Sequence, residues 1–174
     1  MGLTINRDVF PLAQVFTISR GSRTEAKVLS VKISRGDVEG WGECVPYARY
    51  NETASSVSAQ IESLPEAFDR QGLYELLPAG AARNAVDCAL WDLEAKQSGQ
   101  RVWQLAGLPA PGPEITAYTL SLNCPENMRA QAAEHAHRPL LKIKLGTPDD
   151  MPRLEAVRAG APRSDIIVDA NEGW

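Results

Sequence analysis

The stretch LLKIKL at residues 140–145 alternates apolar and charged side chains, with two lysines two residues apart. Because successive side chains of a β-strand point to opposite faces, Lys142 and Lys144 share one face of the strand. The apolar face is expected to pack under helices, which leaves both ammonium groups on the inner face of a sheet. Buried unpaired charges are costly, whereas an edge strand with solvent-facing lysines is common. This strand alone leaves both interpretations open.

A second stretch, DIIVDAN at residues 165–171, reads as another buried strand, and Asp169 lies near its carboxyl end. Parallel α/β folds place their functional residues at the carboxyl ends of the strands. Lys142, Lys144 and Asp169 are therefore expected to converge on one edge of one sheet. In that setting a metal-ligand or electrostatic role for Asp169 is favoured over a simple helix cap.

The region around these stretches alternates strands with helices. Strands separated by helices of this length indicate right-handed βαβ units and a parallel sheet. A parallel sheet needs both faces covered and its edges protected, and three strands do not complete one, so we expect this sequence to be the front part of a longer protein. The predicted strands cover residues 115–122, 140–145 and 165–171, and the predicted helices cover 125–137 and 148–159.

The first half of the chain has a different pattern, with strands before helices. Three prolines within residues 109–113 remove backbone donors, which predicts a linker there. The pattern therefore indicates an α+β domain over residues 1–112, followed over 113–174 by a parallel α/β arrangement. The first half is expected to have strands over 5–18 (broken at Pro11), 26–34 and 38–44, and helices over 54–69 and 82–98.

The composition excludes several classes of protein. With 174 residues and a net charge of −4, the chain has no basic field to hold a nucleic-acid backbone. It lacks the run of about 18 apolar residues that a membrane span needs, and the basic start of a secretory signal. Three widely spaced cysteines indicate neither a disulfide framework nor a zinc site. We expect a reduced, cytoplasmic protein that binds neither nucleic acid nor membrane.

These motifs together resemble a known family. The Lys142-Ile143-Lys144 strand end and the VDAN segment at 168–171 resemble the muconate-lactonizing subgroup of the enolase superfamily. Three further motifs are similar to bacterial dipeptide epimerases that act on L-Ala-D/L-Glu: ISRGSRTE at 18–25, GECVPY at 42–47 and PAGAARNA at 78–85. The resemblance covers essentially the whole chain. It implies an enolase-type N-terminal capping domain over residues 1–112, followed over 113–174 by the first part of a modified TIM-type (β/α) barrel that is truncated after its third strand.

The resemblance also implies roles for individual residues. Lys144 corresponds to one of two acid/base lysines. Lys142 corresponds to a second catalytic residue, which helps hold the substrate carboxylate and tunes the neighbouring Lys144. Asp169 corresponds to the first of three acidic Mg²⁺ ligands; the other two ligands and the opposing lysine belong to later strands, absent from this sequence. Arg20, on a loop of the capping domain, corresponds to a residue that meets the acidic side chain of the substrate. Thr119 lies where the first barrel strand touches the substrate.

The chemistry that the resemblance implies needs these groups. Removing the proton from an amino-acid Cα leaves an enediolate whose negative charges lie on the carboxyl oxygens. Mg²⁺ is a hard cation that stabilises such oxygens, and a lysine base with Mg²⁺ is the arrangement known in the enolase superfamily. The expected function is therefore Mg²⁺-dependent epimerisation of small acidic dipeptides, by analogy in murein peptide recycling, and the family implies a homo-oligomer.

Two alternatives stay open at this point. The first is another Lys-x-Lys enzyme of the same superfamily, such as an N-succinylamino acid racemase or a cycloisomerase. The second belongs to a different class: a truncated, non-catalytic fragment that acts as an interaction module. An open parallel edge and exposed apolar helix faces would leave such a fragment poorly stable and prone to association.

Overall fold

The computed structural model describes residues 1–148 and 150–174, and it divides into two compact units. The sequence-based division places residues 11–26 in the first domain, whereas their contacts group them with the second unit. These residues are the tip of the first β-hairpin and are called the hairpin tip below. Unit 1 comprises Met1–Phe10 and Lys27–Pro111, and unit 2 comprises Pro11–Ala26 and Gly112–Trp174.

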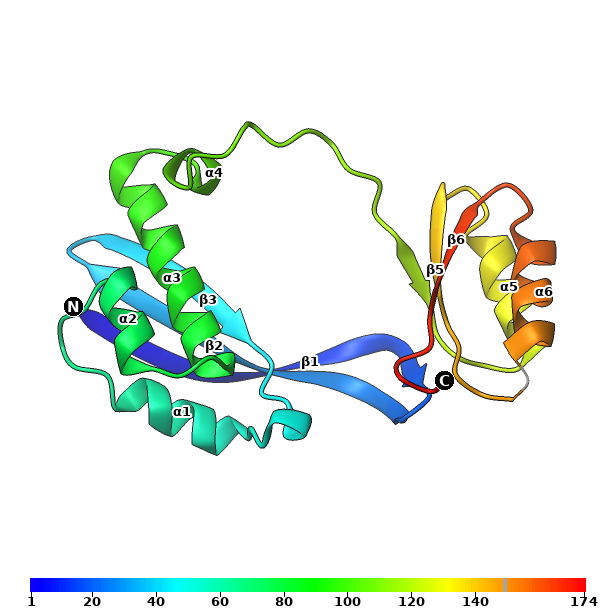
Figure 1. The fold of residues 1–174 in the computed structure, drawn as a ribbon, viewed down its shortest axis with the longest axis horizontal. Helices are drawn as coiled ribbons and strands as arrows, with labels where there is room; N and C mark the ends of the chain where they lie inside the picture. Colours follow the sequence, from blue (N-terminus) through cyan, green and yellow to red (C-terminus); the bar gives the residue numbers. More distant parts are fainter. Residues whose placement is uncertain (149) are drawn as a thin grey trace. The chain divides into compact units, whose positions relative to one another are not determined.

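The first sheet has three strands in the order β1-β2-β3 (Figure 1). Strands β2 and β3 are antiparallel and are joined by a turn in which Gly36 has a φ of 61°. β1 runs through Pro11 without the predicted break, because a proline at a sheet edge need not donate to a neighbouring strand. The strands are β1 (Gly2–Ile18), β2 (Gly21–Arg35) and β3 (Val38–Cys44).

The helices of unit 1 follow the strands, as predicted. Thr53 caps α1 by accepting a hydrogen bond from the backbone of Ser56, and Gly99 ends α3 in the left-handed conformation. α1 is shorter than the predicted helix over 54–69, because Pro65 disfavours a helical conformation at the residue before it. Asp69 then caps a separate helix, α2, which the sequence pattern did not reveal. The elements are η1 (Ala48–Tyr50), α1 (Ala54–Glu62), α2 (Arg70–Leu76), α3 (Ala81–Ser98) and α4 (Val102–Leu105).

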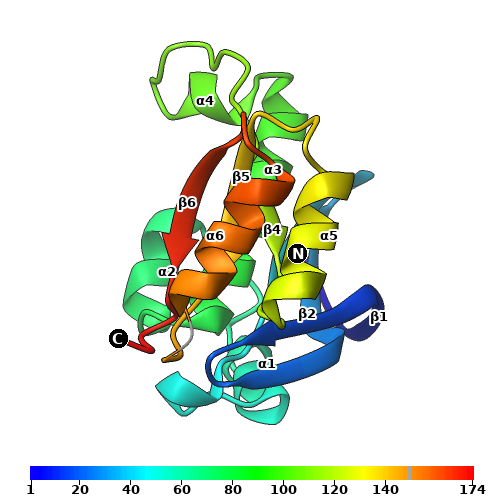
Figure 2. The same cartoon turned by 90° about the vertical axis from the view of Figure 1, so that its right-hand side faces the viewer.

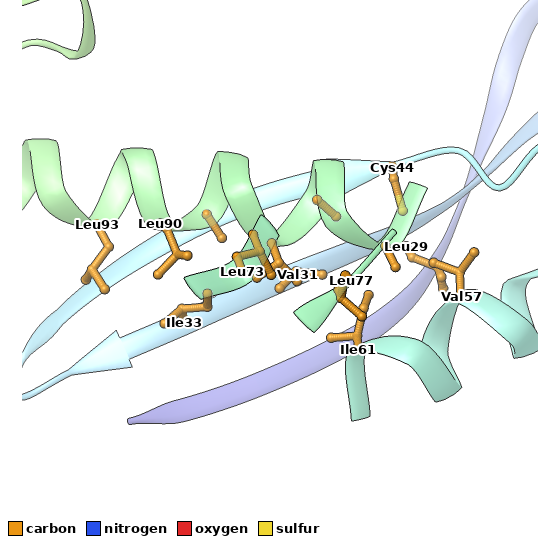
Figure 3. Packing of buried hydrophobic residues seen from close by; sticks show 14 residues of the cluster. Leu29, Val31, Ile33, Cys44, Val57, Ile61, Leu73, Leu77, Leu90 and Leu93 are labelled. Carbon is orange, nitrogen blue, oxygen red and sulfur yellow. The ribbon is translucent and has the colours of Figure 1, made fainter. Parts of the chain in front are cut away.

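One apolar cluster fills the space between the first sheet and its helices (Figure 3). Val31 and Ile33 of β2 are fully buried in it, together with Leu90 of α3. Strand β3 can approach α3 closely because β3 has a glycine, Gly42, where the two elements meet. A Cβ atom on Gly42 would lie 2.0 Å from the carbonyl oxygen of Ala85 in α3. Unit 1 is therefore held together mainly by apolar packing.

Unit 2 is built on a parallel three-stranded sheet in the order β4-β5-β6 (Figure 1). β4 is shorter than the predicted strand over 115–122 because only three of its residues pair with β5. The predicted helix over 148–159 begins at Asp150, and residue 149 lies outside the described residues. The elements are β4 (Tyr118–Leu120), α5 (Pro125–Glu134), β5 (Leu140–Lys144), α6 (Asp150–Gly160) and β6 (Asp165–Asp169).

Helices α5 and α6 lie side by side over one face of this sheet (Figure 2). Leu141 and Ile143 are fully buried under them, and Leu145 is nearly so. The apolar face predicted from the alternation in β5 is thus confirmed, and Lys142 and Lys144 occupy the opposite face. No helix among the described residues is long and apolar enough to cross a lipid bilayer. The cytoplasmic location stays a prediction from the sequence.

Candidate functional site

Two lysines and one aspartate meet at the carboxyl ends of β5 and β6. The Nζ atoms of Lys142 and Lys144 each lie 2.8 Å from Oδ2 of Asp169. The fold explains this convergence, because parallel neighbours end at the same edge of a sheet and the register places Lys144 beside Asp169. The structure therefore brings together the three residues that the strand pattern predicts to converge.

This Lys–Asp cluster places two amines beside one carboxylate. The side chain of Lys144 is only 8% exposed, whereas those of Lys142 and Asp169 are 32% and 30% exposed. Hydrogen bonds from Lys142 and Lys144, together with one from the backbone N–H of Asn171, hold the pKa of Asp169 well below its usual range. The carboxylate therefore stays ionised.

The hairpin tip places an aromatic ring beside the less exposed lysine. The Nζ atom of Lys144 lies 5.8 Å from the centroid of the Phe16 ring, and the guanidinium of Arg23 lies 5.4 Å from the same centroid. A cation at about this distance is attracted by the ring and is partly shielded from water. Sequence reasoning missed Phe16, because a single aromatic residue in a long strand carries no signal of what it contacts.

Arg20 lies at the turn of the hairpin tip, close to the segment that follows β6. Its Nη1 atom is 3.0 Å from Oε2 of Glu172. The hydroxyl of the preceding residue, Ser19, donates to the carbonyl oxygens of Ala170 and Asn171 at 3.2 and 3.3 Å. Arg20 is therefore brought to the same edge of the sheet as the Lys–Asp cluster, although it is far away in the sequence.

Thr119 occupies the neighbouring strand on the lysine side of the sheet. The register of β4 and β5 pairs Thr119 with Lys142, one row back from the carboxyl edge where Lys144 pairs with Asp169. Thr119 is partly buried. Its position beside Lys142 places a hydroxyl group on the face where the sequence resemblance expects contact with substrate.

The loops after β5 and β6 are fastened to each other by one carboxylate. Asp150 accepts hydrogen bonds from the backbone N–H groups of Gly146 and Thr147 at 2.8 and 3.1 Å, and from the indole N–H of Trp174 at 2.8 Å. Partial burial raises the pKa of Asp150, but the hydrogen bonds from Trp174, Gly146 and Thr147 outweigh it and lower the pKa. This carboxylate therefore orders the loops that border the cluster.

The oxygen atoms at this edge supply part of a donor set for a hard cation. Asp169 contributes a carboxylate, and the side-chain oxygen of Asn171 is buried without a hydrogen-bond partner. Oxygen ligands of these kinds suit Mg²⁺. No group of three or more His, Cys, Asp or Glu residues is gathered for a metal ion in residues 1–148 and 150–174. The described residues thus fit one side of a magnesium site.

Comparisons of the sequence place these features among known proteins. Residues 1–107 match the model of the mandelate racemase / muconate lactonizing enzyme N-terminal domain. The chain is 43% identical over 173 residues to the L-Ala-D/L-Glu epimerase of Escherichia coli, a match that covers 96% of this chain and 54% of that protein. The chain therefore spans about half the length of the curated relatives it matches.

Comparisons of the structure agree with this match. A TM-score of 0.93 relates the chain to an enolase family member from Agrobacterium tumefaciens with homology to dipeptide epimerases, solved with sodium and L-Ala-L-Glu; identity is 54%, covering 99% of this chain and 54% of that one. A dipeptide epimerase from Enterococcus faecalis, complexed with Mg and L-Leu-L-Tyr, gives a TM-score of 0.88 at 26% identity, with 99% and 53% covered. The expected fold class, an α+β capping domain followed by part of an α/β barrel, is confirmed.

Proposed function

Because the chain belongs to the mandelate racemase / muconate lactonizing enzyme family, we propose that its protein is a Mg²⁺-dependent dipeptide epimerase acting on L-Ala-D/L-Glu-type substrates. The observation that carries the proposal is the pair of lysine amines that share one oxygen of Asp169 at the carboxyl edge of the sheet. The names of the relatives support the dipeptide as substrate.

Lys144 is the base in this proposal. An epimerase must remove the proton from Cα of the second residue of the dipeptide, and a deprotonated amine can accept it at Nζ. The electron pair of the broken C–H bond moves into the adjacent carboxylate and gives an enediolate. The low exposure of the Lys144 side chain and the nearby ring of Phe16 limit the access of water to this amine. A separate general acid, on the opposite face of Cα from Lys144, returns a proton to complete the inversion.

Lys142 and Asp169 prepare the surroundings of that step. Lys142 supplies a positive charge that attracts and orients the substrate carboxylate, on which negative charge grows as the proton leaves. Asp169, with Asn171 beside it, would hold the Mg²⁺ ion; when bound, the ion supplies further positive charge beside the same carboxylate oxygens. The two lysines keep Asp169 ionised, which is the form that a metal ligand requires.

Arg20 and Thr119 are assigned to substrate selection. The guanidinium of Arg20 pairs with the carboxylate of Glu172 in this structure, so its position and chemistry suit the acidic side chain of a glutamate-containing dipeptide. Thr119 adds a hydroxyl group beside Lys142 on the same face of the sheet. Together these residues favour a small acidic dipeptide over a neutral one.

The experiment that tests the proposal uses the full-length protein with Mg²⁺ in D₂O. Proton NMR follows the Cα–H signals of L-Ala-L-Glu, L-Ala-L-Ala and the N-acetyl and N-succinyl derivatives of glutamate. The expected result is exchange and epimerisation at the glutamate Cα, fastest for L-Ala-L-Glu. Faster turnover of an N-acylated amino acid would instead support the racemase alternative. No exchange with any of these compounds would refute the assignment.

A further inference from the structure

A buried serine binds the backbone of the hairpin tip. Ser121 follows β4 directly and is only 4% exposed. Its Oγ atom accepts a hydrogen bond from the backbone N–H of Thr17 at 3.1 Å and donates to the carbonyl oxygen of Val15 at 3.3 Å. Next to these, the N–H of Leu122 donates to the carbonyl oxygen of Thr17 at 3.1 Å. The Ser121 hydroxyl therefore satisfies two backbone groups that a neighbouring strand would otherwise satisfy.

The two backbone groups that Ser121 binds lie on either side of Phe16 along the chain. The ring of Phe16 is the one placed 5.8 Å from Nζ of Lys144. Farther along the tip, Ser19 binds the carbonyl groups that follow β6, and Arg20 comes next. The hairpin tip is thus attached to unit 2 at two points, through Ser121 and through Ser19. Phe16 lies between the two backbone groups that Ser121 binds, and Arg20 directly follows Ser19.

We propose that Ser121 is a positioning residue for substrate selection. It fixes the hairpin tip at the carboxyl ends of the barrel strands, so that Phe16 covers Lys144 and Arg20 meets the acidic side chain of the dipeptide. This inference rests on the proposed function and deepens it, because it names the residue that sets the geometry of the specificity loop without touching substrate.

Removing the hydroxyl should loosen the tip without detaching it. In Ser121→Ala, the N–H of Thr17 and the carbonyl of Val15 lose their partner and must turn toward water, which is costly for partly buried groups. The bonds made by Ser19 and by the backbone of Leu122 remain. The fold of unit 2 should therefore survive, and the loss should fall on the alignment of Phe16 and Arg20.

The test compares three variants of the full-length protein. Ser121→Ala removes the hydroxyl, and Ser121→Thr keeps it. Ser164→Ala is the matched control, because Ser164 is also buried in unit 2 and donates to a backbone carbonyl, that of Arg138 at 2.8 Å, but at the amino end of β6. Ser121→Ala should raise the KM for L-Ala-L-Glu about 5- to 30-fold, as expected for one or two lost hydrogen bonds.

The ratio of KM values for L-Ala-L-Glu and L-Ala-L-Ala separates positioning from general damage. Ser121→Ala should raise this ratio, and Ser121→Thr should bring it back toward the wild-type value. Ser164→Ala should lower the melting temperature and leave the ratio unchanged. An equal rise of both KM values in Ser121→Ala, or the same change of ratio in Ser164→Ala, would overturn the inference.

A second measurement does not depend on activity. Amide hydrogen exchange at Thr17 should become faster in Ser121→Ala and stay close to wild type in Ser121→Thr and Ser164→Ala. Faster exchange supports the anchor even if no dipeptide is turned over, so a failed epimerase assignment is distinguished from a failed anchor. Unchanged exchange at Thr17 in Ser121→Ala would show that the hydroxyl does not hold the tip.

Discussion

Both sheets of the molecule place lysine beside a carboxylate, and the two arrangements differ in charge balance and in exposure to water. In unit 1, Lys32 lies 2.9 Å from Glu39, and their side chains are 30% and 44% exposed. In unit 2, Lys142 and Lys144 share the single carboxylate of Asp169, and Lys144 is almost fully buried. The first arrangement pairs one amine with one carboxylate, whereas the second gives one carboxylate two amines, of which Lys144 is nearly buried.

This difference indicates which cluster has a function beyond stability. An exposed ion pair contributes about 0–1 kcal/mol, so Lys32 and Glu39 need no further role. A buried amine in excess of its carboxylate partners lowers stability, and an apolar residue in the place of Lys144 would cost less. The second amine therefore supports the proposal that this cluster binds the negatively charged carboxylate of a substrate.

The sharpest way to break this comparison is to remove one lysine from each sheet. Lys144→Ala should lower the rate of Cα–H exchange from one epimer of L-Ala-Glu by about 100- to 10 000-fold, because it removes the proposed base. Lys32→Ala should leave that rate close to wild type. Deuterium incorporation from D₂O, followed by proton NMR for each epimer separately, measures the effect. Unchanged incorporation from both epimers would refute the assignment of Lys144.

The second prediction concerns the packing that holds unit 1 together. In Gly42→Ala the new Cβ would lie 2.0 Å from the carbonyl oxygen of Ala85 and 2.8 Å from the backbone N of Ala89. We expect a loss of about 3 kcal/mol in the free energy of unfolding, because β3 must move away from α3. Denaturant titration measures the loss.

Gly112→Ala is the control for that measurement, because a Cβ on Gly112 would meet open space. Its expected effect is within about 0.5 kcal/mol. If Gly42→Ala were as stable as wild type, the close contact of β3 with α3 would not be a source of stability. The view that unit 1 is held together mainly by tight apolar packing would then be contradicted.

Sequence reasoning succeeds where local periodicity and capping decide the structure. The alternation over 140–145 predicted both faces of β5, and the sequence pattern predicted the start of α1 at residue 54 and the end of α3 at residue 98. It predicted the Lys–Asp cluster because parallel strands end at a common edge. Pro65 carried a signal that would have shortened the helix predicted over 54–69.

The hairpin tip shows where sequence reasoning stops. Its place in unit 2 depends on hydrogen bonds that Ser121 and Ser19 make with residues more than 100 positions away. Such contacts follow no repeat in the sequence, and the hydroxyl of a serine has no preferred partner. The contact between Phe16 and Lys144 was hidden for the same reason, because it exists only after the tip has been fastened to the second sheet.

A further prediction concerns Arg20, whose side chain is exposed and lies at the same edge of the sheet as the Lys–Asp cluster. Arg20→Ala should raise the KM for L-Ala-L-Glu about tenfold, since charged hydrogen bonds to the substrate are lost, and should change the KM for L-Ala-L-Ala much less. Arg70→Ala is the matched control: in unit 1 this guanidinium pairs with Glu94 at 2.9 Å and stacks 3.5 Å from the centroid of the Trp91 ring. Arg70→Ala should lower stability and leave the KM ratio as it is. Equal effects on both dipeptides would remove Arg20 from substrate selection.

The smallest expected effect concerns the pH dependence of stability and the thiol of Cys44, which is buried in unit 1. Burial, followed by the negative charges of Glu52 and Glu43, raises the pKa of the Cys44 thiol from 9.0 to about 11. Above pH 9 the unfolded chain releases this proton, while the folded chain keeps it until about pH 11. Unfolding is then favoured as the pH rises, so the stability that the protonated thiol contributes at neutral pH is lost in this window.

Between pH 9 and 10 we expect the free energy of unfolding to fall by about 1 kcal/mol more in wild type than in Cys44→Ala. Denaturant titrations at pH 8, 9 and 10 measure the difference. Cys124 is exposed in unit 2, so Cys124→Ala should keep the wild-type pH dependence and controls for the loss of a thiol. The same slope in Cys44→Ala and wild type would mean that Cys44 titrates alike in the folded and unfolded chains. The burial of this thiol in unit 1 would then make no pH-dependent contribution to stability between pH 9 and 10.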